Sequence, residues 1–106
     1  MKIIDIGHNN YSVDKAMSVL EREISSAMCS NKIRAIKIIH GHGSGTLRKA
    51  VHQWCQEQKG RFRDVILGEE YDLFHQNSLA MRQDSGLPDD RDFGRRNRAV
   101  TYLWLV

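Results

Sequence analysis

The stretch RAIKIIHGHGSGTLRK, residues 34–49, decides the fold. Residues 34–39 form a nearly unbroken apolar run, which is typical of a β-strand that is buried on both faces. Three alternating glycines, Gly41, Gly43 and Gly45, then end the strand, and apolar residues at helical spacing follow them. A buried strand that passes through a glycine loop into a helix indicates an α/β protein.

The sequence on either side of this stretch supplies the other elements. We predict a strand over 2–6, a helix over 13–28, a second helix that begins at Leu47 and stops at Gly60, and strands over 61–67 and 99–106. An irregular insert at about 68–98 precedes the last strand, and a short helix over 71–82 is one interpretation of its first part. The order β-α-β-α-β-insert-β predicts one domain over 1–106, a two-layer α/β sandwich with a four-stranded mixed sheet and right-handed crossovers.

Length and composition exclude several classes of protein. A chain of 106 residues with 41% hydrophobic and 27% charged residues is a globular domain with a real core, not a disordered segment. No apolar run is long enough for a membrane span or a signal peptide. Two cysteines, Cys29 and Cys55, are too few for a disulfide framework, so we expect reduced thiols and a cytoplasmic protein.

The charge is distributed unevenly along the chain. The formal net charge of +3 by itself indicates no partner. Residues 1–53 hold eight basic and four acidic side chains, whereas residues 54–106 hold eight basic and nine acidic ones. The first half is therefore the better candidate for binding an anion.

The glycine loop has the features of a phosphate-binding site. A helix start presents unpaired N–H groups and the positive end of the helix dipole, and the glycines let the backbone approach a ligand. Arg48 and Lys49 lie in the first helical turn, where an anion would offset their repulsion with the dipole. The spacing fits neither the P-loop nor the dinucleotide-binding motif, so we expect no nucleotide cofactor. The alternative is that the glycines only make a tight turn.

Asp5, His8, His40 and His42 form a second candidate constellation. If the first two strands are parallel neighbours, these residues emerge at one edge of the sheet, where ligands bind in open α/β sheets. Two imidazoles and an orienting carboxylate supply acid–base chemistry, although each histidine taken alone fits a solvated loop residue. No cysteine lies near the His-x-His pair to complete a zinc site, while a catalytic divalent ion held by Asp5 and a substrate phosphate stays open.

Four arginines precede the last strand, at positions 91, 95, 96 and 98, with Phe93 among them. Such a cluster is able to hold a nucleic-acid backbone and stack on a base. Asp84, Asp89, Asp90 and Asp92 precede or interleave with them, which favours a solvated loop of mutually screened charges.

These motifs resemble those of the Smr domain family, small modules related to the C-terminal part of bacterial MutS proteins. The resemblance covers most of the chain and is best over 4–67. Residues 40–45 with the helix start at 47–51 match the family's His-Gly-x-Gly loop, which is a specific match. The family's Asp-x-His motif corresponds to Asp5-Ile6-Gly7-His8, in which glycine and histidine have exchanged places. The turn before the last strand is Asn97-Arg98-Ala99, with alanine where the family commonly has glycine.

The resemblance implies a fold like the C-terminal domain of bacterial translation initiation factor three, and an endonuclease that nicks DNA or cleaves RNA. It implies acid–base roles for Asp5, His8 and His40. We expect the phosphate contacts to come from Gly41, His42, Gly43, Ser44, Gly45, Arg48, Lys49 and Asn97. The alternatives are a nucleic-acid-binding module without catalysis, which the Gly7–His8 exchange and Ala99 favour, or a protein-interaction domain that uses the insert as its recognition surface.

Overall fold

The computed structural model describes residues 1–58 and 60–106. Its elements follow the predicted order: β1 (Lys2–Asp5), α1 (Val13–Met28), β2 (Ala35–Ile39), α2 (Thr46–Glu57), β3 (Phe62–Leu67), the 3₁₀ turn η1 (Gly68–Glu70), α3 (Gln76–Asp84) and β4 (Val100–Leu105). The Ser12 hydroxyl caps α1 by accepting the Lys15 N–H at 3.2 Å. The α/β fold class is confirmed.

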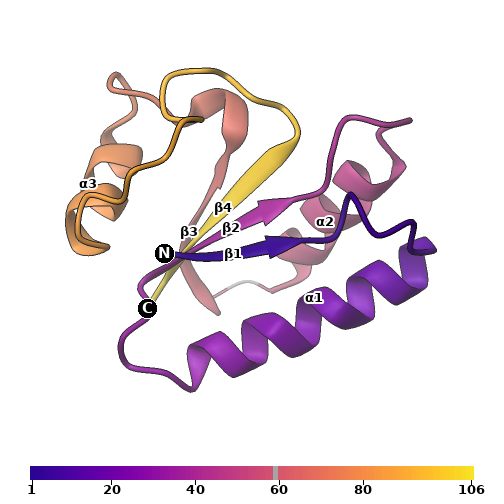
Figure 1. Cartoon of the computed structure of the whole chain (residues 1–106). Helices are drawn as coiled ribbons and strands as arrows, with labels where there is room; N and C mark the ends of the chain where they lie inside the picture. The colour runs from indigo at the N-terminus through magenta and orange to yellow at the C-terminus, as the bar shows by residue number, and fades with distance from the viewer. Residues whose placement is uncertain (59) are drawn as a thin grey trace.

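The four strands form one mixed sheet in the order β1-β2-β4-β3. β1 and β2 are parallel, and β4 lies antiparallel between β2 and β3. The prediction of a four-stranded mixed sheet is therefore confirmed. The parallel pair brings the carboxyl ends of β1 and β2 to the same edge of the sheet (Figure 1).

The side chains of the sheet alternate between two apolar clusters, as the pleat of a strand requires. Helices α1 and α2 cover one face of the sheet (Figure 1), and we call this the helix face. From β2 it receives Ile36 and Ile38, which pack with Leu20 and Val51 of the two helices. On the opposite face, Ala35 of β2 and Tyr102 and Trp104 of β4 pack with Met81 of α3.

The insert is more ordered than expected. The helix predicted over 71–82 begins only at Gln76, because Asp72 makes a turn by accepting the Phe74 N–H at 2.8 Å. His75 then caps α3 by accepting the Ser78 N–H at 3.2 Å.

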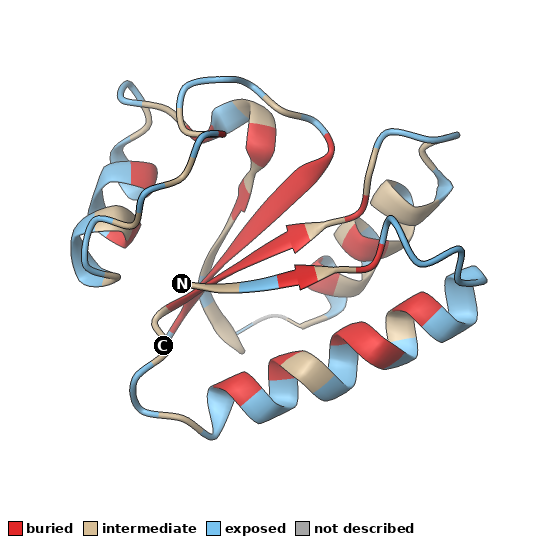
Figure 2. Ribbon diagram, viewed as in Figure 1, coloured by how far each residue is buried: buried red, intermediate tan, exposed pale blue. Residues whose placement is uncertain are grey.

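The insert covers only part of the second face of the sheet. Beyond it, the part of this face formed by β1 and the C-terminal end of β2 stays uncovered, and exposed residues are visible along β1 (Figure 2). Ile3 of β1 is 59% exposed. We call this uncovered part the open face. No helix in the described part of the chain is long and apolar enough to cross a membrane.

The interpretation of the insert's charges as a solvated loop holds for the exposed arginines at 91, 95, 96 and 98 but was wrong for Asp90 and Asp92, whose buried ion pairs anchor the insert to the sheet. Lys37 of β2 donates to Asp90 at 2.7 Å and to Asp92 at 2.5 Å. Tyr102 of β4 donates its hydroxyl to Asp90 at 2.6 Å. Burial alone would lower the pKa of Lys37, but its hydrogen bonds to the two carboxylates outweigh burial and raise that pKa. Lys37 is therefore a charged buried anchor that fixes the segment before β4.

Candidate functional site

The carboxyl ends of β1 and β2 place the predicted residues at one edge of the sheet. Asp5 lies opposite Ile39 in the parallel register, and the Ile6 N–H donates to the Ile39 carbonyl at 2.9 Å. The loop that carries His8 therefore runs beside the loop that carries His40 and His42. The expectation that the first two strands are parallel neighbours is confirmed.

The pleat sends the side chains of Asp5 and His40 to opposite faces. Asp5 shares the open face with Ile39, its partner in the register. His40 continues the series of Ile36 and Ile38, so its ring lies on the helix face, 5.8 Å from the ring of His52 in α2. The structure brings Asp5 and His8 together and separates both from the ring of His40.

Asp5 and His8 form a carboxylate–imidazole pair on the open face. The His8 Nδ1–H donates to Asp5 Oδ2 at 2.7 Å, while the other carboxylate oxygen accepts the Gly7 N–H at 3.0 Å. In the neutral ring this pairing assigns the proton to Nδ1, so Nε2 is the nitrogen with a lone pair to accept a proton. The His8 side chain is 72% exposed, so that nitrogen is accessible.

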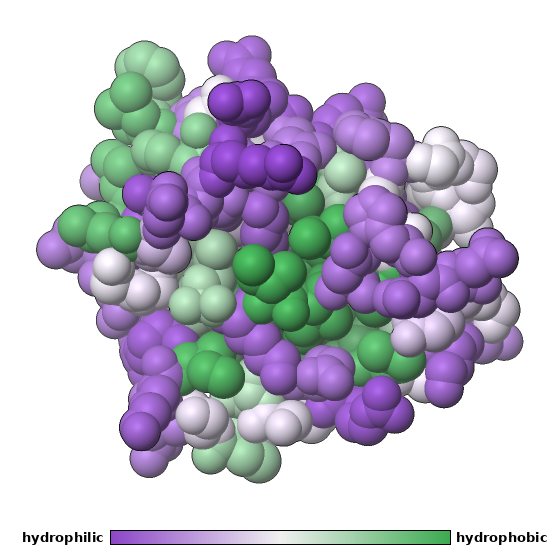
Figure 3. Space-filling model, in the orientation of Figure 1, coloured by the Kyte–Doolittle hydropathy of each residue, from purple (hydrophilic) through white to green (hydrophobic). Residues whose placement is uncertain are grey.

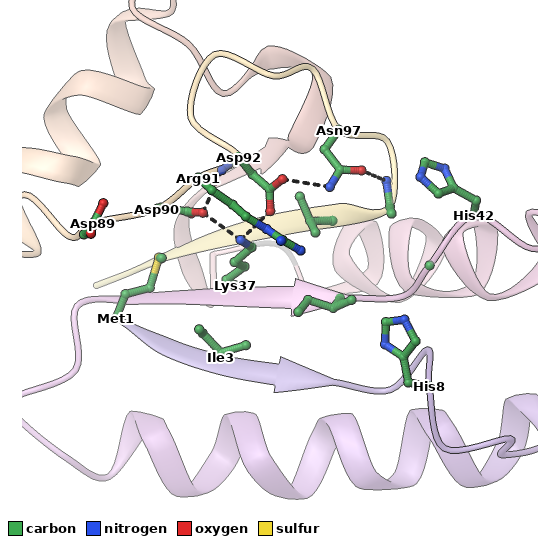
Figure 4. Close-up of a pocket in the computed structure, with 14 residues that line it drawn as sticks. Met1, Ile3, His8, Lys37, His42, Asp89, Asp90, Arg91, Asp92 and Asn97 are labelled. Atoms are coloured by element: carbon green, nitrogen blue, oxygen red, sulfur yellow. Dashed lines mark hydrogen bonds and ion pairs between the residues drawn. The ribbon is translucent and has the colours of Figure 1, made fainter.

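A hollow of about 630 Å³ opens beside this pair on the open face. Its lining includes His8, Gly41, His42 and Asn97, and its floor is apolar, formed by residues such as Ile39 and Val100. His8 and His42 stand on neighbouring loops at the mouth of the hollow (Figure 4). Polar side chains surround the apolar floor on this side of the molecule (Figure 3).

Gly7 allows the two loops to meet backbone against backbone. A Cβ at this position would lie 2.8 Å from the His40 carbonyl carbon and 3.0 Å from the Gly41 nitrogen. No L side chain fits there unless one of the loops moves. The exchange of glycine and histidine therefore has a structural consequence: it places the imidazole one residue later, where it pairs with Asp5.

His40 is buried and both of its ring nitrogens are engaged. Nδ1 donates to the Gly41 carbonyl at 3.3 Å, and because a carbonyl only accepts, Nε2 must accept the Thr101 hydroxyl at 2.9 Å. The Thr101 oxygen in turn accepts the Nε2–H of His52 at 3.1 Å. Burial lowers the pKa of His40 to about 4, so the ring is neutral at pH 7. A chain of hydrogen bonds thus runs from α2 through His40 to the glycine loop.

The glycine loop and the start of α2 form a second hollow, of about 380 Å³. Gly41, Gly43 and Gly45 all have positive φ, at 78°, 39° and 85°, which explains the alternating glycines. Gly45 caps α2 without a side-chain hydrogen bond, and the Thr46 N–H donates to the Ser44 hydroxyl at 3.4 Å. The start of the helix borders an opening that is also lined by Ser44, Gly7 and Asn10. This arrangement suits an oxyanion such as a phosphate.

The two cations of the first α2 turn differ in their contacts. Arg48 donates to Glu69 at 2.8 Å, and the same carboxylate oxygen lies 3.6 Å from Arg98. Arg48 is therefore engaged with η1 rather than directed at the glycine loop. Lys49 is exposed and makes no salt bridge with any residue that the structure describes.

Asn97 holds the turn that leads into β4. Its amide nitrogen donates to Asp92 at 2.9 Å, and its amide oxygen accepts the Ala99 N–H at 2.9 Å. Since Asp92 is fixed by Lys37, the buried ionic cluster also sets the position of this wall of the larger hollow. Sequence reasoning missed Lys37, Thr101 and His52. A lysine inside an apolar strand was the one available signal.

Within the described ranges, no group of three or more histidine, cysteine, aspartate or glutamate side chains is arranged to hold a metal ion. Among the described residues, Asp5 has His8 beside it as a further donor of this kind. A structural metal centre of three or more such ligands is therefore not present in this part of the chain.

The fold agrees with comparisons to known proteins. A family model for the Smr domain matches residues 8–72, which is more than half of the chain, and the chain belongs to the Smr domain family. The family resemblance seen in the sequence is thereby confirmed.

Two relatives are proteins of the MutS2 type. The chain is 29% identical over 56 residues to the Endonuclease MutS2 of Brevibacillus brevis, an alignment that covers 53% of this chain and 7% of that protein. The crystal structure of the Smr domain of Thermus thermophilus MutS2 covers 100% of this chain and 99% of its own, with a TM-score of 0.65 at 17% sequence identity. This structural likeness shows the shared fold.

Proposed function

We propose that this chain binds nucleic acid and cleaves phosphodiester bonds in the hollow between His8 and His42. The observation that carries the proposal is the Asp5–His8 pair, which shares one hollow with His42 next to a glycine loop suited to a phosphate. The name of the Brevibacillus brevis relative, an endonuclease, agrees with this class of reaction.

The residues of the open face divide the chemistry between them. His8 takes a proton through Nε2, and the Asp5 carboxylate stabilises the imidazolium that forms, as in hydrolytic triads. His42, at the opposite side of the hollow's mouth, gives a proton to the leaving oxygen. The N–H groups of the glycine loop and of the first α2 turn hold the phosphate.

His40 acts as a positioning residue in this proposal. Although His40 lines the hollow at the glycine loop, its ring nitrogens are engaged with Thr101 and the Gly41 carbonyl, so neither is free to transfer a proton. It fixes the end of β2 and the first peptide of the glycine loop, from which His42 projects.

RNA is the substrate that this set of groups favours. A 2′-hydroxyl is already held next to the scissile phosphate, so a base and an acid suffice for cleavage. DNA would require the activation of a water molecule instead.

The test is cleavage of an end-labelled 12-nucleotide RNA, the same strand with a single 2′-deoxy substitution at the cleaved position, and supercoiled plasmid. We expect cleavage of the RNA only, reduced by about 10²- to 10⁴-fold in His8→Ala and in His42→Ala. Gln53→Ala, an exposed position of α2 that does not line the hollow, serves as the matched control. Full cleavage in both histidine variants would refute the assignment.

A second candidate is a nucleic-acid-binding module without catalysis, which the exchange of Gly7 and His8 relative to the family pattern favours. It predicts salt-sensitive binding of oligonucleotides with no strand scission by the unsubstituted chain. The same assay therefore separates the two functions.

A further inference from the structure

The acidic and basic side chains of the insert differ in where they point. Segment 68–98 holds seven acidic and five basic side chains, so its sum is acidic. Six of the acidic side chains accept hydrogen bonds within the protein: Glu69, Glu70, Asp72, Asp84, Asp90 and Asp92. The carboxylates are thereby used for internal contacts.

Four of the five arginines of the insert, in contrast, are exposed to solvent, whereas Arg82 is half-buried and donates to the Tyr71 hydroxyl and the Pro88 carbonyl. Arg91, Arg95 and Arg96 are exposed and form no salt bridge with the residues that the structure describes. The Arg98 side chain is 68% exposed, and its Nε lies 3.6 Å from Glu69 Oε2. The outward surface before β4 is therefore basic, although the segment as a whole is not.

An exposed aromatic ring stands beside these arginines. Phe74 is 89% exposed and its neighbour Leu73 is 60% exposed. The Asp72 turn holds Phe74 in place through the 2.8 Å hydrogen bond to its N–H, so the ring stands on an ordered turn. Apolar side chains gather at this corner of the molecule, over the loop between η1 and α3, next to strongly hydrophilic ones (Figure 3).

The Phe74 ring and Arg96 border one hollow of about 300 Å³. Asp72, Leu73, Phe74, Phe93, Gly94 and Arg96 line it. The base of this hollow is held by two contacts. The Gly94 N–H donates to the Tyr71 carbonyl at 2.8 Å, and the Arg82 guanidinium carbon lies 4.1 Å from the centroid of the Phe93 ring. A surface that is ordered before binding loses little entropy when a ligand docks.

We propose that this surface, formed by Leu73, Phe74, Phe93, Arg95 and Arg96, binds a single-stranded nucleic acid. We call it the insert tip. A base stacks on Phe74 while the arginines contact the flanking phosphates, which is how single strands are held by aromatic and basic side chains. A duplex keeps its bases stacked inward and offers no free base face to a lone ring. Charge complementarity with the outward arginines favours this occupant over an apolar protein segment.

The insert tip and the hollow of the open face are linked by neighbouring residues of the chain. Arg96 borders the hollow of the insert tip, and the next residue, Asn97, lines the larger hollow together with His8 and His42. The proposal places the bound strand so that it continues from the insert tip past Asn97 toward the Asp5–His8 pair. This inference rests on the proposed function for its ligand class and adds that the substrate is single-stranded and is gripped outside the reacting centre.

The test uses fluorescence anisotropy with a labelled 12-nucleotide RNA, its abasic counterpart and the duplex of the same sequence. We expect Phe74→Ala to weaken binding of the RNA by roughly 5- to 150-fold, as the loss of one base–aromatic stack would. Binding of the abasic strand should stay unchanged, and Phe74→Trp should restore the RNA affinity. Arg95→Gln should weaken both strands and reduce the slope of affinity against salt by about one. Leu79→Ala, which removes a 44% exposed apolar side chain of α3, is the matched control.

Three results would overturn the proposal: unchanged RNA affinity in Phe74→Ala, an equal loss for the abasic strand, or tighter binding of the duplex than of the single strand. Each would show that no base stacks on Phe74, and the last two would point to another partner for the ring.

Failure of the proposed function remains distinguishable from failure of this inference. If the chain does not cleave any of the substrates, and Phe74→Ala still weakens binding of the single strand, the binding role of the insert tip is supported and the proposed catalysis is refuted. If Phe74→Ala leaves the affinity unchanged while cleavage still depends on His8, the reverse holds.

Discussion

The two faces of the sheet place chemically identical side chains in opposite settings. On the helix face, His40 is 4% exposed and neutral, and its ring nitrogens are occupied by Thr101 and Gly41. On the open face, His8 is largely exposed and keeps one ring nitrogen free. The difference arises from the pleat of β1 and β2, because successive residues at the ends of these strands point to opposite faces of the sheet. The face on which a histidine lies therefore decides whether its ring is available for proton transfer.

The largest effect that sharpens this comparison is expected from Asp5→Asn. The substitution removes the negative charge that stabilises a protonated His8, while its size and position stay the same. We expect the rate of RNA cleavage to fall by roughly 10²-fold or more, with oligonucleotide affinity unchanged or slightly higher. Asp89→Asn, an exposed carboxylate at the far rim of the same hollow, is the control for the loss of one charge. Equal losses in both variants would contradict an orienting role for Asp5.

The helix face predicts a dependence of stability on pH. The pKa of His40 is lowered to about 4 in the folded state, against about 6.5 in the unfolded chain, so the unfolded state binds the extra proton between these values. The contribution of the neutral ring is present above pH 6.5 and is lost as pH falls from 6.5 to 4. We expect the free energy of unfolding to drop by a few kcal/mol in this window.

Urea denaturation at several pH values measures this dependence. His40→Gln keeps a polar side chain without a titrating group and should make the profile less steep between pH 4 and 6.5, with a remaining contribution from His52, whose pKa is also lowered by burial. Gln53→Ala, at an exposed position of α2, should leave the profile as in the unsubstituted chain. An unchanged profile in His40→Gln would contradict a buried neutral ring at this position.

A smaller effect is expected at the boundary between the faces. Gly7→Ala adds a Cβ at 2.8 Å from the His40 carbonyl carbon, so the two loops must separate by a few tenths of an ångström or more. We expect a loss of about 1–3 kcal/mol in the free energy of unfolding, together with slower cleavage. The control is Gly43→Asn, since Gly43 has a positive φ but no atom within 4 Å of an added Cβ, and asparagine tolerates that conformation. An unchanged free energy of unfolding in Gly7→Ala would show that the loops are not in close contact.

The strand and glycine loop at 34–49 could be predicted because their signals are local. An apolar run, alternating glycines and a helical stripe each depend only on neighbouring residues, and the structure follows them from Ala35 to Glu57. The face on which each residue lies could also be predicted. Ile36, Ile38 and His40 are spaced two residues apart, and this spacing indicates that His40 shares the face of the two isoleucines, which pack against the helices.

The contacts of the insert could not be predicted from the sequence, because they join residues that are far apart in the chain. Lys37 pairs with carboxylates 53 and 55 positions away, and no local pattern shows which aspartates turn inward. The close approach of Gly7 to His40 likewise depends on the register of β1 against β2. The same limit hid the direction of Arg48, whose partner Glu69 lies in η1.

Chemical rescue by imidazole tests most directly the claim that the open face carries the reaction. His8→Ala leaves a solvent-facing space beside Asp5, which a free imidazole molecule is able to enter and in which it can take over the proton transfer. We predict that added imidazole restores RNA cleavage in His8→Ala in a saturable manner and does not restore it in His40→Ala. Rescue of His40→Ala alone, or undiminished cleavage by His8→Ala without imidazole, would contradict the account.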